Sequence, residues 1–220
     1  MDNYVVKPLS VDTWDAFARL VERHNGVFGG CWCTWFHTFH AEKTFTAEGN
    51  HALKEQLVKE DRAHAALVFD GDEAVAWAQY GPPGELPNIH HRKEYEETLD
   101  KLPDYRITCI FVDKKYRRKG VTAIALRGAI DLIAEAGGGI VEGYPHDTTD
   151  GKNVSVLYNA TRSLYEGAGF DYLPPQRQEE LCDAQGRVLK ALERGRGSES
   201  EHALLVPRLG QRAGMSPGVL

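Results

Sequence analysis

The sequence predicts an α/β domain of the α+β kind, in which helices flank a mixed and mostly antiparallel central sheet. The first observation is a hairpin signal, because two apolar runs at 64–69 and 74–80 enclose a turn at 70–72. The second is an apolar run at 107–112, which precedes a helical pattern at 123–136 and then a further strand. A right-handed strand–helix–strand crossover makes its two strands parallel, so the sheet combines both kinds of pairing.

The other elements follow in chain order from apolar spacing, helix caps and turn residues. They are a strand at 5–9, a helix that starts after 10–13 and ends near 24–26, an aromatic loop at 29–36, a helix at 46–61, a charged surface segment at 87–102, a strand at 106–113, a helix at 122–136, a strand at 140–144, a helix at 154–167 and a strand at 170–173.

The pattern weakens towards the C-terminus. Residues 178–194 fit either a helix or a hairpin that turns at 183–186, and 203–206 fit a last strand. We therefore expect a domain core at residues 1–174 and a C-terminal extension at 175–220 that completes the sheet and ends in a flexible tail.

Length, charge and cysteine content argue against several classes of protein. The 220 residues suffice for one domain with extensions, and the formal net charge of −6 argues against a nucleic-acid binder, whose affinity depends on phosphate contacts. The sequence contains neither an apolar run of about twenty residues, which a membrane span needs, nor an apolar signal peptide. Four cysteines without an export signal predict a reducing, cytoplasmic location. A homodimer stays open.

The turn that precedes the helix at 122–136 concentrates positive charge. Arg117, Arg118 and Lys119 lie directly before Gly120. Free backbone N–H groups at a helix N-terminus, with the positive end of the helix dipole behind them, form an anion site. The turn therefore predicts a phosphate or diphosphate ligand, with a solvated basic turn as the plainer alternative.

The spacing of this turn differs from two common phosphate-binding loops, because neither G-x-x-x-x-G-K-[ST] nor G-x-G-x-x-G is present. Instead, Val112, Arg117, Gly120 and Thr122 form a pattern that resembles motif A of the GNAT superfamily of acyl-CoA-dependent N-acyltransferases. Thr122 departs from the family's usual Gly or Ala, and its hydroxyl is able to hydrogen-bond or to cap the helix there.

A second resemblance follows in the expected order. Tyr158-Asn159, Leu164-Tyr165 and Gly169-Phe170 are similar to motif B of the family, an Asn and a Tyr followed by Gly-Phe. The resemblance covers residues 64–174 and leaves the flanking segments unexplained.

The resemblance implies how the co-substrate, most simply acetyl-CoA, is bound. Two parallel strands, at 109–113 and 140–144, splay apart, and the acyl-CoA lies between them. The residues that bind it are then Phe111 and Val112, through backbone groups, and Asn159 on the pantetheine arm, with Arg117, Arg118, Lys119, Gly120, Val121 and Thr122 on the diphosphate.

The resemblance also implies direct attack of a primary amine, in a small molecule or a peptide, on the thioester. Tyr165 matches the family's general acid, and a phenol is able to protonate the leaving thiolate. A packing tyrosine on an amphipathic helix is the alternative.

A base has to take a proton from the ammonium group, and Glu142 is our candidate because a carboxylate within an apolar strand needs a reason to be there. An ion pair with Arg106 or Arg118 is the alternative. His146 and Asp147, just past that strand, are further candidates.

The aromatic loop at 29–36 has two interpretations. Trp32, Trp35 and Phe36 form either a wall for the acceptor amine or ordinary packing under a loop. Cys31 and Cys33, with His37 and His40, suggest zinc, but structural zinc sites space their cysteines further apart. We therefore predict no metal.

The sequence thus predicts an acetyl-CoA-dependent N-acetyltransferase. Two other classes stay open: a non-catalytic acyl-CoA sensor of the same fold, which binds without turnover, and a metal-binding regulatory protein built on the Cys-Trp-Cys segment, which metal analysis separates. The acceptor itself is not specified by the sequence.

Overall fold

The computed structural model of the chain describes residues 4–89, 92–97, 101–145, 159–173 and 187–193. Its centre is a seven-stranded mixed sheet in the order β1-β2-β3-β4-β5-β7-β6. The strands are β1 (Tyr4–Pro8), β2 (His64–Asp70), β3 (Glu73–Gly81), β4 (Tyr105–Val112), β5 (Gly139–Gly143), β6 (Asp171–Leu173) and β7 (Arg187–Leu192). All neighbours pair antiparallel except β4 and β5, which pair parallel, as the sequence predicts.

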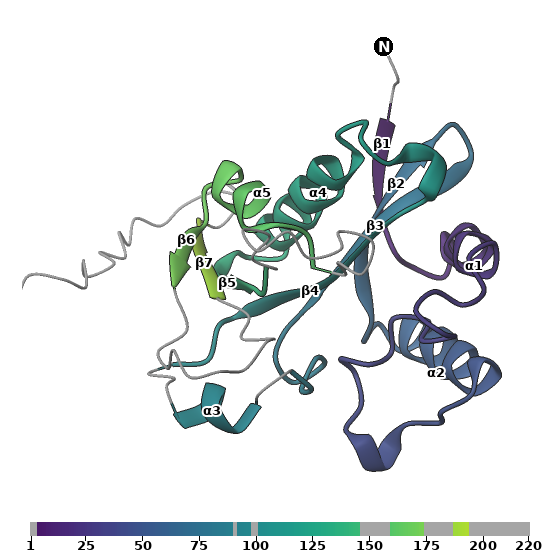
Figure 1. Cartoon of the computed structure of the whole chain (residues 1–220), viewed down its shortest axis with the longest axis horizontal. Helices are drawn as coiled ribbons and strands as arrows, with labels where there is room; N and C mark the ends of the chain where they lie inside the picture. The colour runs from purple at the N-terminus through teal and green to yellow at the C-terminus, as the bar shows by residue number, and fades with distance from the viewer. Residues whose placement is uncertain (1–3, 90–91, 98–100, 146–158, 174–186, 194–220) are drawn as a thin grey trace, which may run out of the picture.

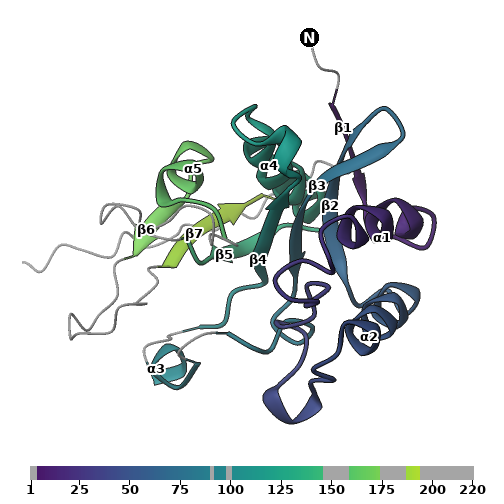
Figure 2. The same cartoon turned by 45° about the vertical axis from the view of Figure 1, so that its right-hand side comes forward.

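Helices cover both faces of the sheet (Figures 1 and 2). One face carries α4 (Val121–Glu135) and α5 (Arg162–Gly167), and the other carries α1 (Trp14–Glu22) and α2 (Ala47–Lys59). A short α3 (Arg92–Glu97) and two 3₁₀ turns (His40–Glu42 and Lys114–Tyr116) complete the described helical segments. No helix in the described ranges is both long and apolar enough to cross a membrane.

Each face buries its own apolar core, which explains why the middle strands are apolar on both sides. The α1–α2 side packs Phe17, Leu20, Leu67 and Trp77, and Phe17 meets the Trp77 indole edge-on at 5.2 Å between ring centroids. The α4 side packs the apolar stripe of that helix against the opposite faces of β1 to β4. The sheet is thus held rigidly in the region where β4 runs into α4.

Two predicted elements differ in the structure. Within the described part of the helix predicted at 154–167, helical structure begins at Arg162, because Thr161 is extended (φ −99°, ψ 155°) and Ala160 is left-handed (φ 61°). Of the two alternatives for 178–194, the helix is wrong at 187–192, since β7 is a strand between β5 and β6. The segments at 154–158, 178–186 and 203–206 lie outside the described residues.

Candidate active site

The turn between β4 and α4 is built to expose backbone N–H groups. Arg118 and Gly120 both adopt left-handed conformations (φ 62° and 77°), and α4 begins directly afterwards at Val121. The N–H groups of Ala123 and Ile124 donate to the Gly120 carbonyl. Within the described chain, the N–H groups of Val121 and Thr122, which precede them, have no hydrogen-bond acceptor. These donors lie at the N-terminal, positive end of a 15-residue helix.

The basic side chains of the same turn are open to solvent. Arg117, Arg118 and Lys119 are all exposed, and the Nε of Arg117 donates a 3.4 Å hydrogen bond to the Val112 carbonyl at the end of β4. Free donors and three cations therefore share one short segment, as an anion site requires.

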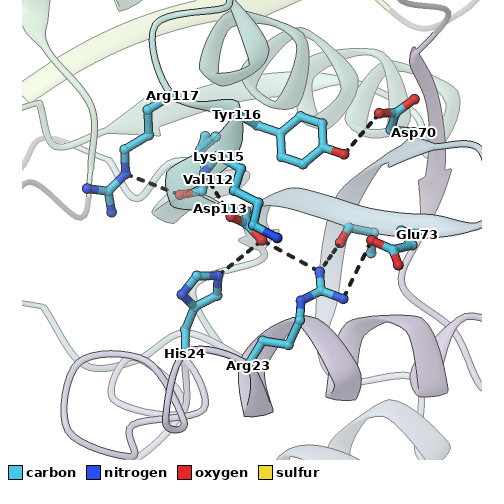
Figure 3. A network of polar contacts seen from close by, with 10 residues as sticks. Arg23, His24, Asp70, Glu73, Val112, Asp113, Lys115, Tyr116 and Arg117 are labelled. Carbon is cyan, nitrogen blue, oxygen red and sulfur yellow. Dashed lines mark hydrogen bonds and ion pairs between the residues drawn. The ribbon is translucent and has the colours of Figure 1, made fainter.

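A polar network fixes this turn from behind (Figure 3). Asp113 accepts a 2.9 Å hydrogen bond from the Lys115 N–H, and its carboxylate lies 3.2 Å from His24 and 3.7 Å from Arg23 at the end of α1. Burial opposes ionisation of Asp113, but the Lys115 N–H, His24 and Arg23 outweigh it and hold the pKa of this carboxyl below its ordinary value.

The outer end of the turn is attached to the β2–β3 hairpin. The Tyr116 hydroxyl donates a 3.0 Å hydrogen bond to Asp70, the last residue of β2 (Figure 3). The turn is thus anchored both to α1 and to the hairpin, which limits its freedom to close over its own N–H groups.

The strands β4 and β5 separate immediately before this turn. Their pairing covers only 105–107 against 141–143, while β4 continues to Val112 with β3 as its partner strand. A bulge interrupts the opposite edge of β4 at Thr108, where the register shifts between Gln79 and Tyr80 on β3. Among the described residues, the β5-facing edge of 108–112 therefore has unpaired backbone groups, and the bulge bends the strand at that point.

Tyr165 lies against the end of β5, on the α4 side of the sheet. Its side chain is fully buried, and a Cβ on Gly143 would come within 2.5 Å of its ring, so glycine is required there. Its hydroxyl has no hydrogen-bond partner among the described residues. Burial, and next the neighbouring Cys109, raise the pKa of Tyr165 above its ordinary value.

Asn159, like Tyr165, is buried and has polar side-chain atoms without a hydrogen-bond partner among the described residues. It is 1% exposed, and both its amide oxygen and its amide nitrogen are without partners in the described part of the chain. Buried polar groups in folded proteins are nearly always hydrogen-bonded, so these atoms point to a ligand. Asn159 lies in a bend three residues before α5 rather than on the helix that the sequence predicts.

Glu142 lies within a buried group of charged and phenolic side chains. Its Oε2 accepts a 2.7 Å hydrogen bond from Tyr95 of α3, and its Oε1 lies 3.6 Å from Arg187 of β7. Burial raises the pKa of Glu142, against the opposing effects of Tyr95, Arg187 and Arg106. The ion-pair partner is thus Arg187, with Arg106 as its neighbour on β4, and not Arg118.

Glu142 and Tyr165 approach the end of β5 from opposite sides. Successive side chains of a strand alternate between faces, and Tyr165 packs on Gly143, the next residue after Glu142. One phenol and one carboxylate therefore flank the place where β4 and β5 separate.

A comparison with known protein families gives a match that agrees with the turn before α4 and the separated strands β4 and β5. A sequence model of the acetyltransferase (GNAT) family matches residues 29–150, which is more than half of the chain. The chain belongs to the GNAT acetyltransferase family. A search of curated protein sequences finds no match.

Solved structures of GNAT-type proteins share the fold. The mosquito arylalkylamine N-acetyltransferase like 5b is similar over 86% of this chain and 100% of that chain, at 15% identity and a TM-score of 0.51. The histone acetyltransferase HPA2 and related acetyltransferase from Corynebacterium glutamicum covers 86% of this chain and 96% of its own, at 16% identity and a TM-score of 0.50. Identities this low establish the fold and leave the acceptor open.

The aromatic loop of this GNAT domain lies mostly within the core. Trp32 is 5% exposed and stacks on Trp14 with ring centroids 6.2 Å apart, and Phe36 is equally buried. Trp35 is half-buried, with the Lys43 ammonium 4.3 Å from its ring centroid. Trp32 and Phe36 are thus packed in the core. That these rings form a wall for the acceptor amine stays a prediction, and Trp35 is the most accessible of the three.

Metal binding by this loop has no support in the described side chains, where no group of three or more His, Cys, Asp or Glu residues is arranged to hold an ion. The side chain of His40 and the alternative bases His146 and Asp147 lie outside the described residues.

The sequence analysis did not single out Lys54, a residue of α2 that is buried and only 1% exposed. The available signal was its position, because it lies three and four residues before Leu57 and Val58, on the apolar face of the helix.

Proposed function

We propose that the chain transfers an acetyl group from acetyl-CoA to a primary amine by direct attack within a ternary complex. The observation that carries this proposal is the fixed turn before α4, where free N–H groups and basic side chains adjoin the separated strands β4 and β5. An elongated thioester with a diphosphate at one end matches both the anion site and the unpaired strand edge.

The chain's own groups fit such a co-substrate. The N–H groups of Val121 and Thr122, with Arg117 to Lys119 beside them, would hold the diphosphate. The free edge of β4 around Phe111 and Val112 would pair with the amides of the pantetheine arm. The unpartnered amide of Asn159 supplies both a donor and an acceptor for the same arm.

Tyr165 is the proton donor of the proposal. Because its pKa is raised, the phenol stays protonated at neutral pH, and its hydroxyl has no competing partner among the described residues. It would deliver a proton to the departing thiolate, which regenerates free CoA. CoA thiolate is a tolerable leaving group, so the positioning of both substrates supplies much of the remaining acceleration.

Glu142 is the proposed proton acceptor. Its raised pKa makes it a stronger base than an ordinary carboxylate. Its Oε1 makes no hydrogen bond within 3.5 Å to the described residues and has Arg187 as an ion-pair partner at 3.6 Å, so accepting an ammonium proton there, directly or through a water, requires Arg187 to share this oxygen. The acid and the base then act from opposite sides of the sheet, and the amine attacks between them.

The decisive experiment is a panel of amines with acetyl-CoA, followed by thiol release and by the mass of the acylated product. Stoichiometric appearance of CoA and of an N-acetylated amine is the expected result. Acetyl-CoA binding with no turnover on small amines, amino acids or lysine peptides would indicate the non-catalytic sensor instead.

A further inference from the structure

A chain of buried hydrogen bonds runs from α2 across β3 to β4. The Nζ of Lys54 donates to Oε1 of Gln79 at 2.6 Å, and Nε2 of Gln79 donates to the Thr108 hydroxyl oxygen at 3.0 Å. Lys54 is 1% exposed, and Gln79 and Thr108 are 0% exposed, so bulk water does not compete for these groups. Each group therefore depends on a partner from the protein or from a ligand.

Lys54 sets the direction of this chain. The amide oxygen of Gln79 only accepts, so Lys54 is the donor to it. The second partner of Lys54 is Nε2 of His37, at 3.1 Å. The other ring nitrogen of His37 lies 2.9 Å from the Glu85 carbonyl oxygen and so carries the proton of the ring. The amide of Gln79 is thus held with its oxygen towards Lys54 and its nitrogen towards Thr108.

This orientation leaves the hydroxyl hydrogen of Thr108 unused. The amide nitrogen of Gln79 only donates, so the Thr108 oxygen is the acceptor in their contact. Among the hydrogen bonds of the described residues, none has the Thr108 hydroxyl as donor. Buried donors in folded proteins nearly always have an acceptor, so this hydrogen points to a ligand, as do the unpartnered atoms of Asn159 and Tyr165.

Thr108 lies where β4 and β5 separate. Ile107, directly before it, is the last residue of β4 that pairs with β5, and its partner there is Gly143. On the other edge of β4, the register shifts between Gln79 and Tyr80, and Thr108 is the residue left without a cross-strand partner. A bulge of this kind bends the strand and re-aims a side chain. Thr108 is therefore the first residue of the free β4 edge.

The proposed acid and base lie at the same level of the sheet. Tyr165 packs on Gly143, the partner of Ile107, and Glu142 comes directly before that glycine. The proposed diphosphate site lies at the opposite end of the free edge, before α4. Because the paired strands close this edge at residue 107, an arm that starts at the diphosphate and follows β4 ends at Thr108.

We propose, on the basis of the acetyl transfer proposed above, that the Thr108 hydroxyl donates a hydrogen bond to the carbonyl oxygen of the acetyl thioester. Gln79 and Lys54 are then positioning residues. They hold the hydroxyl oxygen as an acceptor and so leave its hydrogen for the ligand.

The hydrogen bond would strengthen during the reaction. As the amine nitrogen bonds to the carbonyl carbon, an electron pair of the C=O bond moves onto the oxygen, and it returns when the C–S bond breaks and the thiolate leaves. Thr108 keeps its proton throughout, while Tyr165 protonates the thiolate and Glu142 takes the ammonium proton. A fixed donor aimed at an oxygen that gains charge contributes about 10²–10³-fold to kcat.

Isotope-edited infrared spectroscopy tests the contact without acetyl transfer. The full-length protein is saturated with acetyl-CoA labelled at the acetyl carbonyl, without an amine, and the C=O stretch is recorded. A hydrogen bond to this oxygen lowers the stretching frequency. The wild type should therefore show a lower frequency than Thr108→Val, which keeps the shape of the side chain without its hydroxyl, and Thr108→Ser should restore the lower frequency. Thr38→Val is the matched control and should resemble the wild type, because the buried Thr38 hydroxyl donates to the Thr34 carbonyl at 3.3 Å.

Gln79→Glu tests the direction of the chain. A carboxylate only accepts, so it would keep the contact with Lys54 but take the hydrogen of Thr108 instead of donating one. The stretching frequency should then move to the value of Thr108→Val, although Thr108 itself is unchanged. With the best amine from the panel, both variants should lower kcat about 10²-fold with little change in the KM for acetyl-CoA.

Equal stretching frequencies in saturated wild type and Thr108→Val would overturn the contact, and an unchanged kcat in Thr108→Val would overturn its part in catalysis. A wild-type frequency in folded Gln79→Glu would overturn the positioning role of Gln79 and Lys54. A lowered frequency in a wild type that acetylates no amine would refute the acetyl transfer and still support the contact, so the two failures are distinguishable. Wild-type protein that does not bind acetyl-CoA would overturn both.

Discussion

Replacing Tyr165 by phenylalanine separates catalysis from packing at the proposed acid. The phenylalanine keeps the edge-on contact with Phe170, whose ring centroid is 5.1 Å away, and keeps the close approach to Gly143. Only the hydroxyl is removed, and that hydroxyl makes no hydrogen bond to the described residues.

The expected effects of Tyr165→Phe on stability and on kcat follow from the absence of a hydrogen-bond partner for the hydroxyl. A buried hydroxyl without a partner costs about 1–3 kcal/mol, so its removal should leave the free energy of unfolding unchanged or raise it by about 1 kcal/mol. Loss of a general acid, in contrast, lowers kcat by about 10²–10⁴-fold, which corresponds to a barrier higher by about 2.7–5.5 kcal/mol. Stability and activity should therefore change independently of each other.

The assay combines urea unfolding with thiol release at saturating acetyl-CoA, using the best amine from the panel. Tyr80→Phe is the matched control, because Tyr80 is a buried tyrosine of the same core and should lose no activity. If Tyr165→Phe turned over as fast as the wild type, or if kcat fell only in proportion to lost stability, Tyr165 would be a packing residue.

Three further variants test the neighbouring groups. Asn159→Ala should raise the KM for acetyl-CoA about tenfold with little change in kcat or stability, since it removes contacts made only to the ligand. Burial raises the pKa of Glu142, and a base acts in its deprotonated form, so kcat/KM of the wild type should rise with pH through that pKa. Glu142→Gln should lose this rise. An identical pH profile in the two proteins would exclude the base role. Asp113 has a lowered pKa in the folded protein, so the stability it contributes is present above the pKa of the unfolded state and is lost as pH falls through the pKa of the folded state. Asp113→Asn should therefore be less stable than the wild type in urea unfolding at pH 7. A difference in the free energy of unfolding that stayed constant down to pH 2 would contradict this.

Local signals predicted the framework of the fold because its decisive elements are local. The hairpin β2–β3 has its turn residues between two apolar runs, and β4 leads directly into the motif A turn and α4. The glycine of that turn was predicted from the pattern, and its φ of 77° explains why glycine occurs there.

The missed features depend on long-range packing or on rare backbone angles. The start of α5 was misplaced because Ala160 adopts a left-handed conformation that no residue preference predicts. Lys54 finds Gln79 across 25 positions, and Glu142 finds Tyr95 across 47, so neither partner follows from spacing along the chain. Their chemistry became apparent only once the sheet brought these residues together.

The most direct measurement is isothermal calorimetry of CoA binding to wild type, Gly120→Ala and Gly71→Ala. Both glycines are left-handed (φ 77° and 60°), and at both a Cβ would meet no atom within 4 Å, so the two variants carry similar backbone strain. A left-handed alanine costs about 1–2 kcal/mol, so relaxation of the turn should weaken CoA binding about tenfold in Gly120→Ala. Gly71→Ala lies in the β2–β3 turn next to Asp70, which, in the described chain, contacts the β4–α4 turn only through the Tyr116 hydroxyl, and should bind like the wild type. Absence of binding heat with the wild type, or equal affinities in the two variants, would contradict the assignment of the α4 N-terminus to the diphosphate.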